Sequence, residues 1–282
     1  MMNFDGVLRI AYLGPEGSVS EMAKDYFAKK YEIDAYPTPM QNVKEIIEYV
    51  QDTPNVLGVV PVENSIVGTV RETLDNLMVS NNEKLQILSE VTLPVNHCLL
   101  SKNTELYSIA GIIANTQALI QCREFIKNEM PRNLNIIEVT NAAEAARSLA
   151  DYNLTYASIG TEKTAEIYNL NILKKPINDD QSNRTTFVLI GAFDTEETGH
   201  DRTTLMFTTD DRPGALLEIL NIFYKNNVNL SYISSRPSKE DKDNYIFVVS
   251  LDGHIKQPEI SDTINQVHEK TTSMRVMGSY EK

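Results

Sequence analysis

The stretch V-L-G-V-V-P-V-E-N-S-I-V-G-T-V-R-E-T-L-D-N-L-M, residues 56–78, joins a short apolar run to an amphipathic segment through a polar turn. The apolar run is rich in β-branched residues and predicts a buried strand, whereas the segment after the turn predicts a helix. The same order recurs at 9–14 with 20–30, 111–114 with 117–126, 135–139 with 142–150 and 156–160 with 163–168. Strands that alternate with helices in this way predict an α/β fold with mainly parallel sheets.

A different rhythm begins after the polar segment T-E-E-T-G-H-D-R, residues 195–202, which predicts a linker. The elements expected beyond it are a strand at 203–209, a helix at 210–224, strands at 229–237 and 245–252, a helix at 259–270 and a strand at 274–280. This βαββαβ order is typical of a ferredoxin-like sandwich. We therefore expect two domains, residues 1–194 and 195–282.

The composition excludes several classes of protein. Of the 282 residues 41% are apolar, which supports buried cores, and no apolar run approaches the roughly 20 residues of a membrane helix. The start lacks the features of a signal peptide, and the two cysteines and four histidines show no disulfide or metal-ligand spacing. We expect a reduced, cytoplasmic protein. The net charge of −13 argues against binding to nucleic acid.

Polar residues follow the predicted strands of the first domain at 14–20, 63–69, 115–116, 140–141 and 160–161. Each junction has Ser, Thr or Asn where a helix N-cap belongs, so capping alone explains any single one of them. Five in one sheet system favour a shared ligand site, because ligands of open α/β sheets bind beyond the carboxyl ends of the strands. Helix N-termini bind anions through backbone N–H groups, so the junctions predict a small, hydroxylated ligand with several negative charges.

The stretch Q-S-N-R-T-T-F-V-L-I-G, residues 181–191, places a polar cluster directly before an apolar strand. It predicts one lip of an active site, where the hydroxyls of Thr185 and Thr186 can donate protons to a reaction driven mainly by its substrate. Glu63 is a further acid–base candidate, and a surface carboxylate is an equally good interpretation of it. His97, within an apolar stretch, is more simply a core histidine than a catalyst.

Five motifs, in this order, resemble the prephenate dehydratase family: I-A-Y-L-G-P-E-G-S-V-S (10–20), V-P-V-E-N-S-I-V-G-T-V-R-E-T-L-D (60–75), N-H-C-L-L (96–100), Q-A-L-I-Q-C (117–122) and N-R-T-T-F (183–187). The tail resembles the ACT regulatory domain of that family through P-G-A-L-L (213–217) and S-S-R-P (234–237). The resemblance implies a catalytic domain of two α/β lobes around a cleft, like a type 2 periplasmic binding protein, followed by the ferredoxin-like ACT domain.

The resemblance also implies a reaction, in which prephenate loses water and CO2 to give phenylpyruvate without a metal or organic cofactor. Thr185 matches the threonine that assists departure of the hydroxyl. The positions that match the substrate site are Glu63, Asn64, Ser65, Gly68, Thr69, Ser18, Asn115, Thr116, Gln117, Asn141, Asn183, Thr186 and Phe187. Those that match the site for an effector, L-phenylalanine, are Gly214, Ala215, Leu216, Leu217, Ser235, Arg236 and Pro237. Pairing of ACT domains implies a homodimer or homotetramer.

The chain departs from the family's pattern at several of these positions. It reads T-T-F where the family reads T-R-F, so Thr186 replaces an arginine that could grip a carboxylate. It also reads A-N-T-Q-A-L for S-H-P-Q-A-L, T-N for S-T, G-S-V-S for G-T-F-S and S-S-R-P for E-S-R-P. Two alternatives therefore stay open: a prephenate decarboxylase that keeps the ring hydroxyl, and a non-catalytic module that senses prephenate or phenylalanine.

Overall fold

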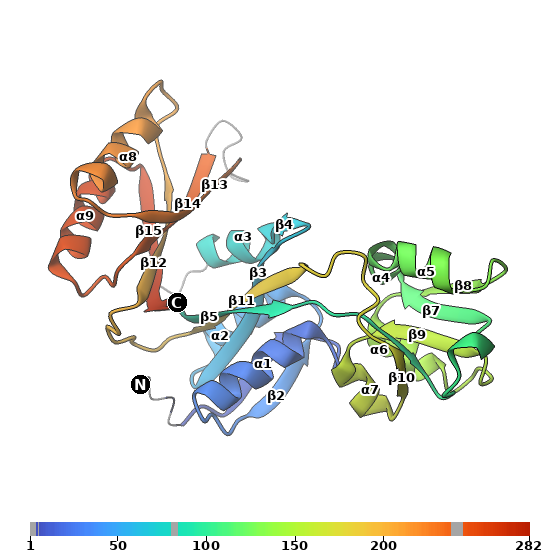
Figure 1. The fold of residues 1–282 in the computed structure, drawn as a ribbon. Helices are drawn as coiled ribbons and strands as arrows, with labels where there is room; N and C mark the ends of the chain where they lie inside the picture. The colour runs from blue at the N-terminus through green and yellow to red at the C-terminus, as the bar shows by residue number, and fades with distance from the viewer. Residues whose placement is uncertain (1–3, 5, 80–83, 238–244) are drawn as a thin grey trace.

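The computed structural model describes residues 4, 6–79, 84–237 and 245–282, and it arranges them around three β-sheets (Figure 1). Two α/β lobes are followed by a smaller βαββαβ unit that packs against the first lobe (Figure 1). The predicted α/β lobes and ferredoxin-like sandwich are confirmed, but the expectation of mainly parallel sheets is wrong, because the sheets of both lobes are mixed. The expected domain boundary at 194/195 lies in the connection between a strand that ends at Gly191 and one that begins at Asp201.

The first lobe is built on a sheet with the order β2-β1-β3-β11-β5, and the short strand β4 pairs with β3. Strands β1, β2 and β3 are parallel, whereas β11 runs antiparallel to both β3 and β5. The strands are β1 (Arg9–Leu13), β2 (Tyr36–Met40), β3 (Val56–Asn64), β4 (Gly68–Thr69), β5 (Gln86–Pro94) and β11 (Arg184–Gly191). The helices are α1 (Val19–Lys30), α2 (Val43–Asp52) and α3 (Arg71–Val79).

The second lobe is formed by the chain between β5 and β11, on a sheet with the order β10-β6-β9-β7-β8. Its strands are β6 (Cys98–Ser101), β7 (Gly111–Asn115), β8 (Asn135–Val139), β9 (Tyr156–Gly160) and β10 (Asn171–Lys174). Its helices are η1 (Leu106–Ser108), α4 (Thr116–Gln121), α5 (Arg123–Glu129), α6 (Ala142–Ser148) and α7 (Glu162–Tyr168).

Two segments, 95–97 and 175–183, cross between the lobes and hydrogen-bond to each other. The backbone N–H of Val95 donates to the carbonyl of Asn183 at 3.0 Å, and that of Ile177 donates to the carbonyl of His97 at 2.9 Å. These bonds hold the two crossings side by side, so the lobes are joined by a double connection.

Strand β11 is apolar on both faces because both faces are covered by helices. Phe187 and Leu189 pack with Phe27 of α1, whereas Val188 and Ile190 belong to the core beneath α2 and α3. A continuous apolar run is typical of a strand that is buried on both sides. The period of two therefore assigns neighbouring side chains of β11 to opposite sides of the sheet.

The third unit has the strand order β13-β14-β12-β15, with every pair antiparallel. Its elements are β12 (Asp201–Thr208), α8 (Ala215–Lys225), β13 (Leu230–Pro237), β14 (Tyr245–Asp252), α9 (Pro258–His268) and β15 (Ser273–Glu281). Both helices cover one face of the sheet, where Phe207, Ile219, Phe223 and Ile264 form the core. The opposite face of the sheet is left to pack against the first lobe.

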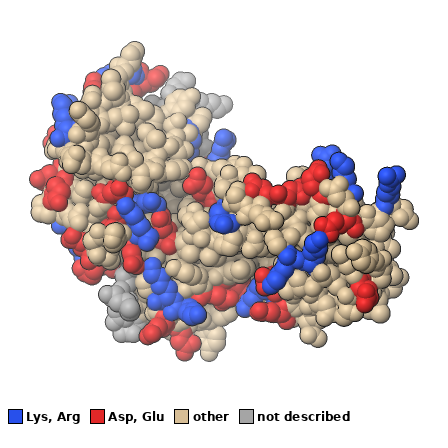
Figure 2. All heavy atoms as spheres, viewed as in Figure 1, with Lys and Arg blue, Asp and Glu red and all other residues tan. Residues whose placement is uncertain are grey.

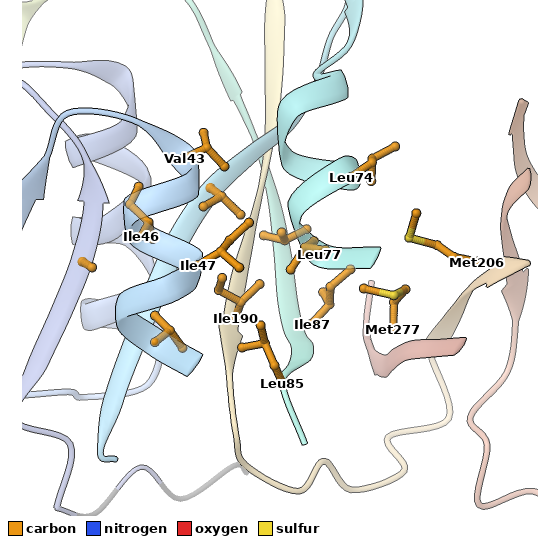
Figure 3. Close-up of a cluster of buried hydrophobic side chains, with 14 of the residues drawn as sticks. Val43, Ile46, Ile47, Leu74, Leu77, Leu85, Ile87, Ile190, Met206 and Met277 are labelled. Carbon is orange, nitrogen blue, oxygen red and sulfur yellow. The ribbon is translucent and has the colours of Figure 1, made fainter. Parts of the chain in front are cut away.

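The first lobe and this sheet share one hydrophobic core, shown in Figure 3. Met206 of β12 and Met277 of β15 join Leu77 and Ile87 of the first lobe, and all four side chains are buried. Burying a side chain of this size contributes about 1.5–3 kcal/mol. The sandwich is therefore docked by apolar contact and not merely tethered by its linker.

Polar contacts fix the register of this docking. Arg275 donates to the carbonyls of Leu77 at 2.8 Å and Leu85 at 3.1 Å. Arg202 pairs with Glu90 at 2.6 Å, and both side chains are mostly buried. A buried guanidinium needs such partners, because an unpaired charge in the interior is costly.

The surface mixes both signs of charge. On the face shown in Figure 2, acidic and basic side chains are interspersed over all three units. Among the described residues, no helix has the length and apolarity needed to cross a membrane.

Gly278 provides a test of the docked arrangement. Its φ is +145°, and a Cβ built there would lie 2.2 Å from the carbonyl oxygen of Ile87 in β5. Gly278→Ala should cost about 3 kcal/mol or more, since overpacking adds to the backbone strain. We expect a lower thermal unfolding midpoint for this variant.

Gly199→Ala is the matched control, because Gly199 also has a positive φ, +85°, but no atom lies within 4 Å of the place that a Cβ would occupy. It should cost only the backbone strain, about 1–2 kcal/mol. Equal effects of the two substitutions would mean that the sandwich does not pack on β5 in solution.

Candidate active site

Asn64, the last residue of β3, organises the polar cluster at the end of the first sheet. Its side-chain Nδ2 donates to Thr185 Oγ1 at 2.9 Å and to Asn183 Oδ1 at 2.8 Å. An amide nitrogen can only donate, so Thr185 Oγ1 is an acceptor in this bond. The hydroxyl proton of Thr185 is therefore left to be donated to another group.

The orientation of the Asn64 amide is fixed by the turn that follows it. Asn64 Oδ1 accepts from the backbone N–H groups of Ile66 and Val67, each at 3.0 Å. A backbone N–H only donates, so the oxygen must face the turn and the nitrogen must face Thr185. Ser65 adds a second link, since its Oγ accepts from the N–H of Arg184 at 2.9 Å.

Two buried polar atoms near the crossings have no hydrogen-bond partner among the described residues, Asn183 Nδ2 and His97 Nδ1. His97 Nε2 lies 2.7 Å from Gln121 Oε1 of the second lobe, so Nε2 carries the proton and Nδ1 is an acceptor. Burial lowers the pKa of His97 and keeps its imidazole neutral. One donor and one acceptor are thus left unsatisfied by the described part of the chain.

The predicted N-cap residues do cap their helices. Ser18 Oγ accepts from the N–H of Glu21 in α1, Asn115 Oδ1 caps α4, and Asn141 Oδ1 caps α6. Thr161 forms a capping box with Thr164 at the start of α7. Four of the five polar junctions are therefore explained locally by capping. The junction at 63–69 is different, because α3 begins only at Arg71 and Asn64 Oδ1 accepts from the N–H groups of the turn. The proposed role of the junctions toward a ligand stays a prediction.

The starts of α1 and α7 bring the two lobes into direct contact. The carbonyl of Gly17 accepts from Thr161 Oγ1 at 2.6 Å and from Thr164 Oγ1 at 3.0 Å. Gly17 has a φ of +83°, and a side chain there would meet Thr164 at 2.9 Å. Only glycine allows this close approach without strain.

A cavity of about 890 Å³ opens between the lobes, at the ends of β1, β2 and β8. It is lined by Gly14, Pro15, Glu16, Pro39, Met40, Gln41, Thr140, Asn141, Ala143, Glu144, Arg147 and Tyr168. Of the predicted substrate positions, only Asn141 is in this lining. Arg147 and Tyr168 were missed by the sequence analysis, since nothing in a helical surface pattern distinguishes them from solvated residues.

Thr186 lies on the opposite side of β11 from Thr185, and its predicted contact with substrate stays a prediction. Its Oγ1 is 2.9 Å from Thr92 Oγ1, and it lines a second cavity, between the first lobe and the sheet of β12–β15. Glu63, its partner across the β3–β11 ladder, lines the same cavity. The alternation of side chains along a strand accounts for this separation.

Phe187 is a core residue in this structure. Its side chain is 2% exposed and packs in the cluster beneath α1. Its predicted contact with substrate stays a prediction. Gly68 and Thr69 form β4 opposite Asn64 and Glu63, and Thr69 Oγ1 lies 3.0 Å from the hydroxyl of Tyr232 in β13.

The segment Asn115, Thr116 and Gln117 belongs to the second lobe, at the start of α4. Thr116 Oγ1 donates to Glu138 at 2.8 Å, and Gln117 is exposed. No hydrogen bond within the described part of the chain joins these three side chains to the Asn64–Thr185 cluster. Their predicted contact with substrate therefore remains a prediction.

The predicted effector loop lies at the start of α8. Gly214 has a φ of +90°, and a small cavity of about 140 Å³ lies beside this loop. The cavity is lined by Thr209, Asp210, Asp211, Arg212, Ala215, Leu216, Tyr245 and Phe247. Leu217 is 60% exposed. The loop thus offers a small hollow with both charged and apolar walls beside a solvent-facing leucine.

The residues of the S-S-R-P segment, 234–237, lie in two different environments. Arg236 is buried and pairs with Asp75 of α3, and it also donates to the carbonyl of Arg71. Ser235 and Pro237 are exposed. Arg236 therefore holds the sheet of β12–β15 against the first lobe, and its predicted role at the effector site stays a prediction.

Metal or thiol chemistry finds no support in the described part of the chain. No group of three or more His, Cys, Asp or Glu side chains there could hold a metal ion. Burial raises the pKa of Cys98 to about 11 and that of Cys122 to about 12, so both thiols stay protonated at neutral pH.

Comparison with known proteins places these features in a family. The prephenate dehydratase family model matches residues 10–195, and the ACT domain model matches residues 203–269. The chain is 33% identical to prephenate dehydratase of Methanocaldococcus jannaschii over 279 residues, which cover 96% of this chain and 97% of that protein. It is also 33% identical over 281 residues to the bifunctional chorismate mutase/prephenate dehydratase of Aquifex aeolicus, covering 100% of this chain and 75% of that protein.

Solved structures show the same similarity. Prephenate dehydratase of Arthrobacter aurescens in complex with L-Phe matches with a TM-score of 0.84 and 31% identity, over 98% of this chain and 90% of that one. The prephenate dehydratase of Staphylococcus aureus matches with a TM-score of 0.80 and 26% identity, over 97% and 100% of the two chains.

Fold and site together define a two-lobed, periplasmic-binding-protein-like enzyme joined to an ACT domain. The chain belongs to the prephenate dehydratase family.

The buried His97 predicts a pH dependence of stability. Because burial lowers its pKa in the folded protein, the unfolded chain binds more protons below pH of about 6.5. The stability is present above that pH and is lost as the pH falls through the lowered pKa. We expect urea unfolding to show this loss in the wild type and a shallower pH dependence in His97→Gln.

The imidazole itself can be followed by NMR to check the cause. A titration of the His97 ring with a midpoint at or above about 6.5 would contradict a buried, neutral histidine. The pH dependence of unfolding of His254→Gln is measured for comparison with that of His97→Gln. Burial also lowers the pKa of His254, which lies in the ACT domain.

Proposed function

We propose that this chain converts prephenate to phenylpyruvate with loss of water and CO2, as a cytoplasmic enzyme of phenylalanine synthesis. The observation that carries the proposal is the Asn64–Thr185 hydrogen bond of 2.9 Å, which leaves the threonine proton available. We also propose that residues 1–194 carry this activity and that 195–282 regulate it. The family membership and the relatives of the same name support the assignment.

The reaction does not need a strong acid in the protein. The carbon–carbon bond to the ring carboxylate breaks and releases CO2, its electron pair moves through the ring, and the carbon–oxygen bond to the hydroxyl breaks. The ring becomes aromatic, which supplies most of the driving force. A hydrogen-bond donor at the departing oxygen lowers the remaining barrier, and Thr185 can fill this role although it is a weak acid.

Binding of the dicarboxylate relies on local donors, because a chain with a net charge of −13 cannot attract it through its general field. The buried Asn183 Nδ2 is one uncharged donor beside Thr185, and Arg147 supplies a cation in the interlobe cavity. We propose that the substrate enters through this cavity and is held at the ends of the strands. Donors that are fixed by the fold need no reorganisation during the reaction.

The departure from T-R-F to T-T-F gives weaker grounds for a decarboxylase than the sequence alone indicated. Thr186 faces the ACT domain, so its change does not alter the face that carries Thr185. The retained Thr185 and its Asn64 partner favour loss of the hydroxyl.

Thr185→Val should lower kcat by about 100-fold or more, since a positioned proton donor contributes about 10²–10⁴. Thr186→Val is the matched control, with the same atoms removed on the other face of β11, and it should stay within about threefold of wild type. Phenylpyruvate formation from prephenate is measured by absorbance.

The same assay separates the alternatives. A dihydro-hydroxyphenylpyruvate product would identify a decarboxylase, and prephenate binding by calorimetry without turnover would identify a sensing module. Either result, or a Thr185→Val variant as active as Thr186→Val, would refute the proposed role of Thr185.

We further propose that L-phenylalanine binds at the loop before α8 and that the chain forms a homodimer or homotetramer through its ACT domains. The support is the small hollow beside Gly214, whose walls are both charged and apolar, and the relative whose structure is a complex with L-Phe. In the wild type, L-phenylalanine should raise the thermal unfolding midpoint and change the rate of turnover.

Gly214→Val should abolish this response, because a β-branched residue is strained at φ +90° and would reshape the loop. Gly199→Val carries the same change at φ +85° away from the loop and should keep the response. A wild type that shows neither effect across a phenylalanine titration would exclude this regulation.

A further inference from the structure

A second cavity, of about 230 Å³, lies between the first lobe and the ACT sheet of the same chain. Its walls are the face of β3, β5 and β11 that points away from Thr185, and the sheet face of β12, β13, β14 and β15. It is lined by Val62, Glu63, Leu74, Ile87, Glu90, Thr92, Thr186, Val188, Arg202, Thr204, Ser231, Tyr232, Val248, Ser250 and Tyr280. It shares no lining residue with the interlobe cavity or with the hollow beside Gly214.

The cavity exists because Thr186 is short. Thr186 is the cross-strand partner of Glu63, so a long side chain at 186 would extend along the carboxylate and into this space. The hydroxyl of Thr186 instead meets Thr92, 2.9 Å away. Contacts on the two walls, such as that of Tyr232 with Thr69, hold the ACT sheet in place around the space.

Of the charged side chains that line the cavity, one carboxylate has no oppositely charged partner among the described residues. Glu90 is paired with Arg202 at 2.6 Å. Glu63 is exposed, and no hydrogen bond or ion pair of its side chain occurs within the described residues. The net charge of the lining is therefore negative, which favours a ligand with an ammonium group next to Glu63.

The other residues that line the cavity provide further contacts for a small amphiphilic molecule. Arg202 lines the cavity, and Glu90 occupies only its Nη1, so the rest of the guanidinium can donate to a carboxylate. Leu74, Ile87, Val188 and Val248 provide an apolar wall. A volume of 230 Å³ is below the roughly 300 Å³ at which pockets for drug-sized ligands begin, so the ligand must be small.

We propose that this cavity binds an α-amino acid with an apolar side chain. Its ammonium group pairs with Glu63, its carboxylate accepts from Arg202, and its side chain packs against the apolar wall. The site is separate from the loop proposed for phenylalanine. Occupation joins the first lobe to the ACT sheet, so the ligand also stabilises the docked arrangement.

Calorimetry with L-leucine on the full chain tests the chemistry of the ligand. L-Leucine should bind, and 4-methylpentanoate and 3-methylbutylamine, which lack its ammonium and its carboxylate respectively, should bind at least about fivefold more weakly. Absence of L-leucine binding at about 10 mM, or equal binding of either truncated compound, overturns the proposal.

Variants locate the site. Glu63→Gln should weaken L-leucine binding by about fivefold, because an exposed ion pair contributes up to about 1 kcal/mol. Thr186→Arg should abolish binding, since the guanidinium would fill the cavity and pair with Glu63. Glu72→Gln removes an exposed carboxylate of α3 outside the cavity and should bind as wild type does.

Two further outcomes would also overturn the proposal. Unchanged binding in Glu63→Gln overturns the proposal even if Thr186→Arg fails to fold. Binding that is lost in Gly214→Val and kept in Glu63→Gln places L-leucine at the ACT loop, and it also overturns the proposal. These are binding measurements, so their outcome does not depend on whether the chain turns over prephenate.

Discussion

The pairing of β11 between β3 and β5 is the constraint on which the rest of the structure depends. The strand returns from the second lobe and runs antiparallel between two strands of the first. Its apolar residues fill the cores on both sides of the sheet, so the lobe would lose both cores without it. The same return creates the double crossing between the lobes and brings Asn183 and Thr185 to the end of β3.

Neighbouring side chains on β11 lie in two different environments, because side chains alternate between the faces of a sheet. Thr185 lies on the α1 side, bonded to Asn64, and Thr186 lies on the side covered by the ACT sheet. The hairpin of β3 and β4 contacts both environments. Asn64 of β3 donates a hydrogen bond to Thr185, and Thr69 of β4 lies within hydrogen-bond distance of Tyr232 in the ACT sheet. A shift of the ACT sheet would therefore reach the hairpin that positions Thr185 through packed, hydrogen-bonded elements.

The fold class and the order of the elements follow from the amino-acid pattern alone. Short β-branched runs followed by amphipathic segments can only be buried as strands covered by helices, and polar side chains at the ends of strands must meet at one edge of a sheet. The motif at 183–187 predicted a polar cluster before a strand, whereas the bonds from Asn64 to Asn183 and Thr185 follow from the pairing of β11 with β3, which the motif did not predict.

The face that each of these residues takes, and the element that covers it, depend on tertiary packing. Thr186 and Phe187 adjoin Thr185 in the motif, yet one faces the ACT sheet and the other is core. Arg236 belongs to an effector motif, yet it pairs with Asp75 of the first lobe. A motif records neighbours along the chain, whereas the side of a strand and the partner of a charge depend on the packing of segments more than a hundred residues apart.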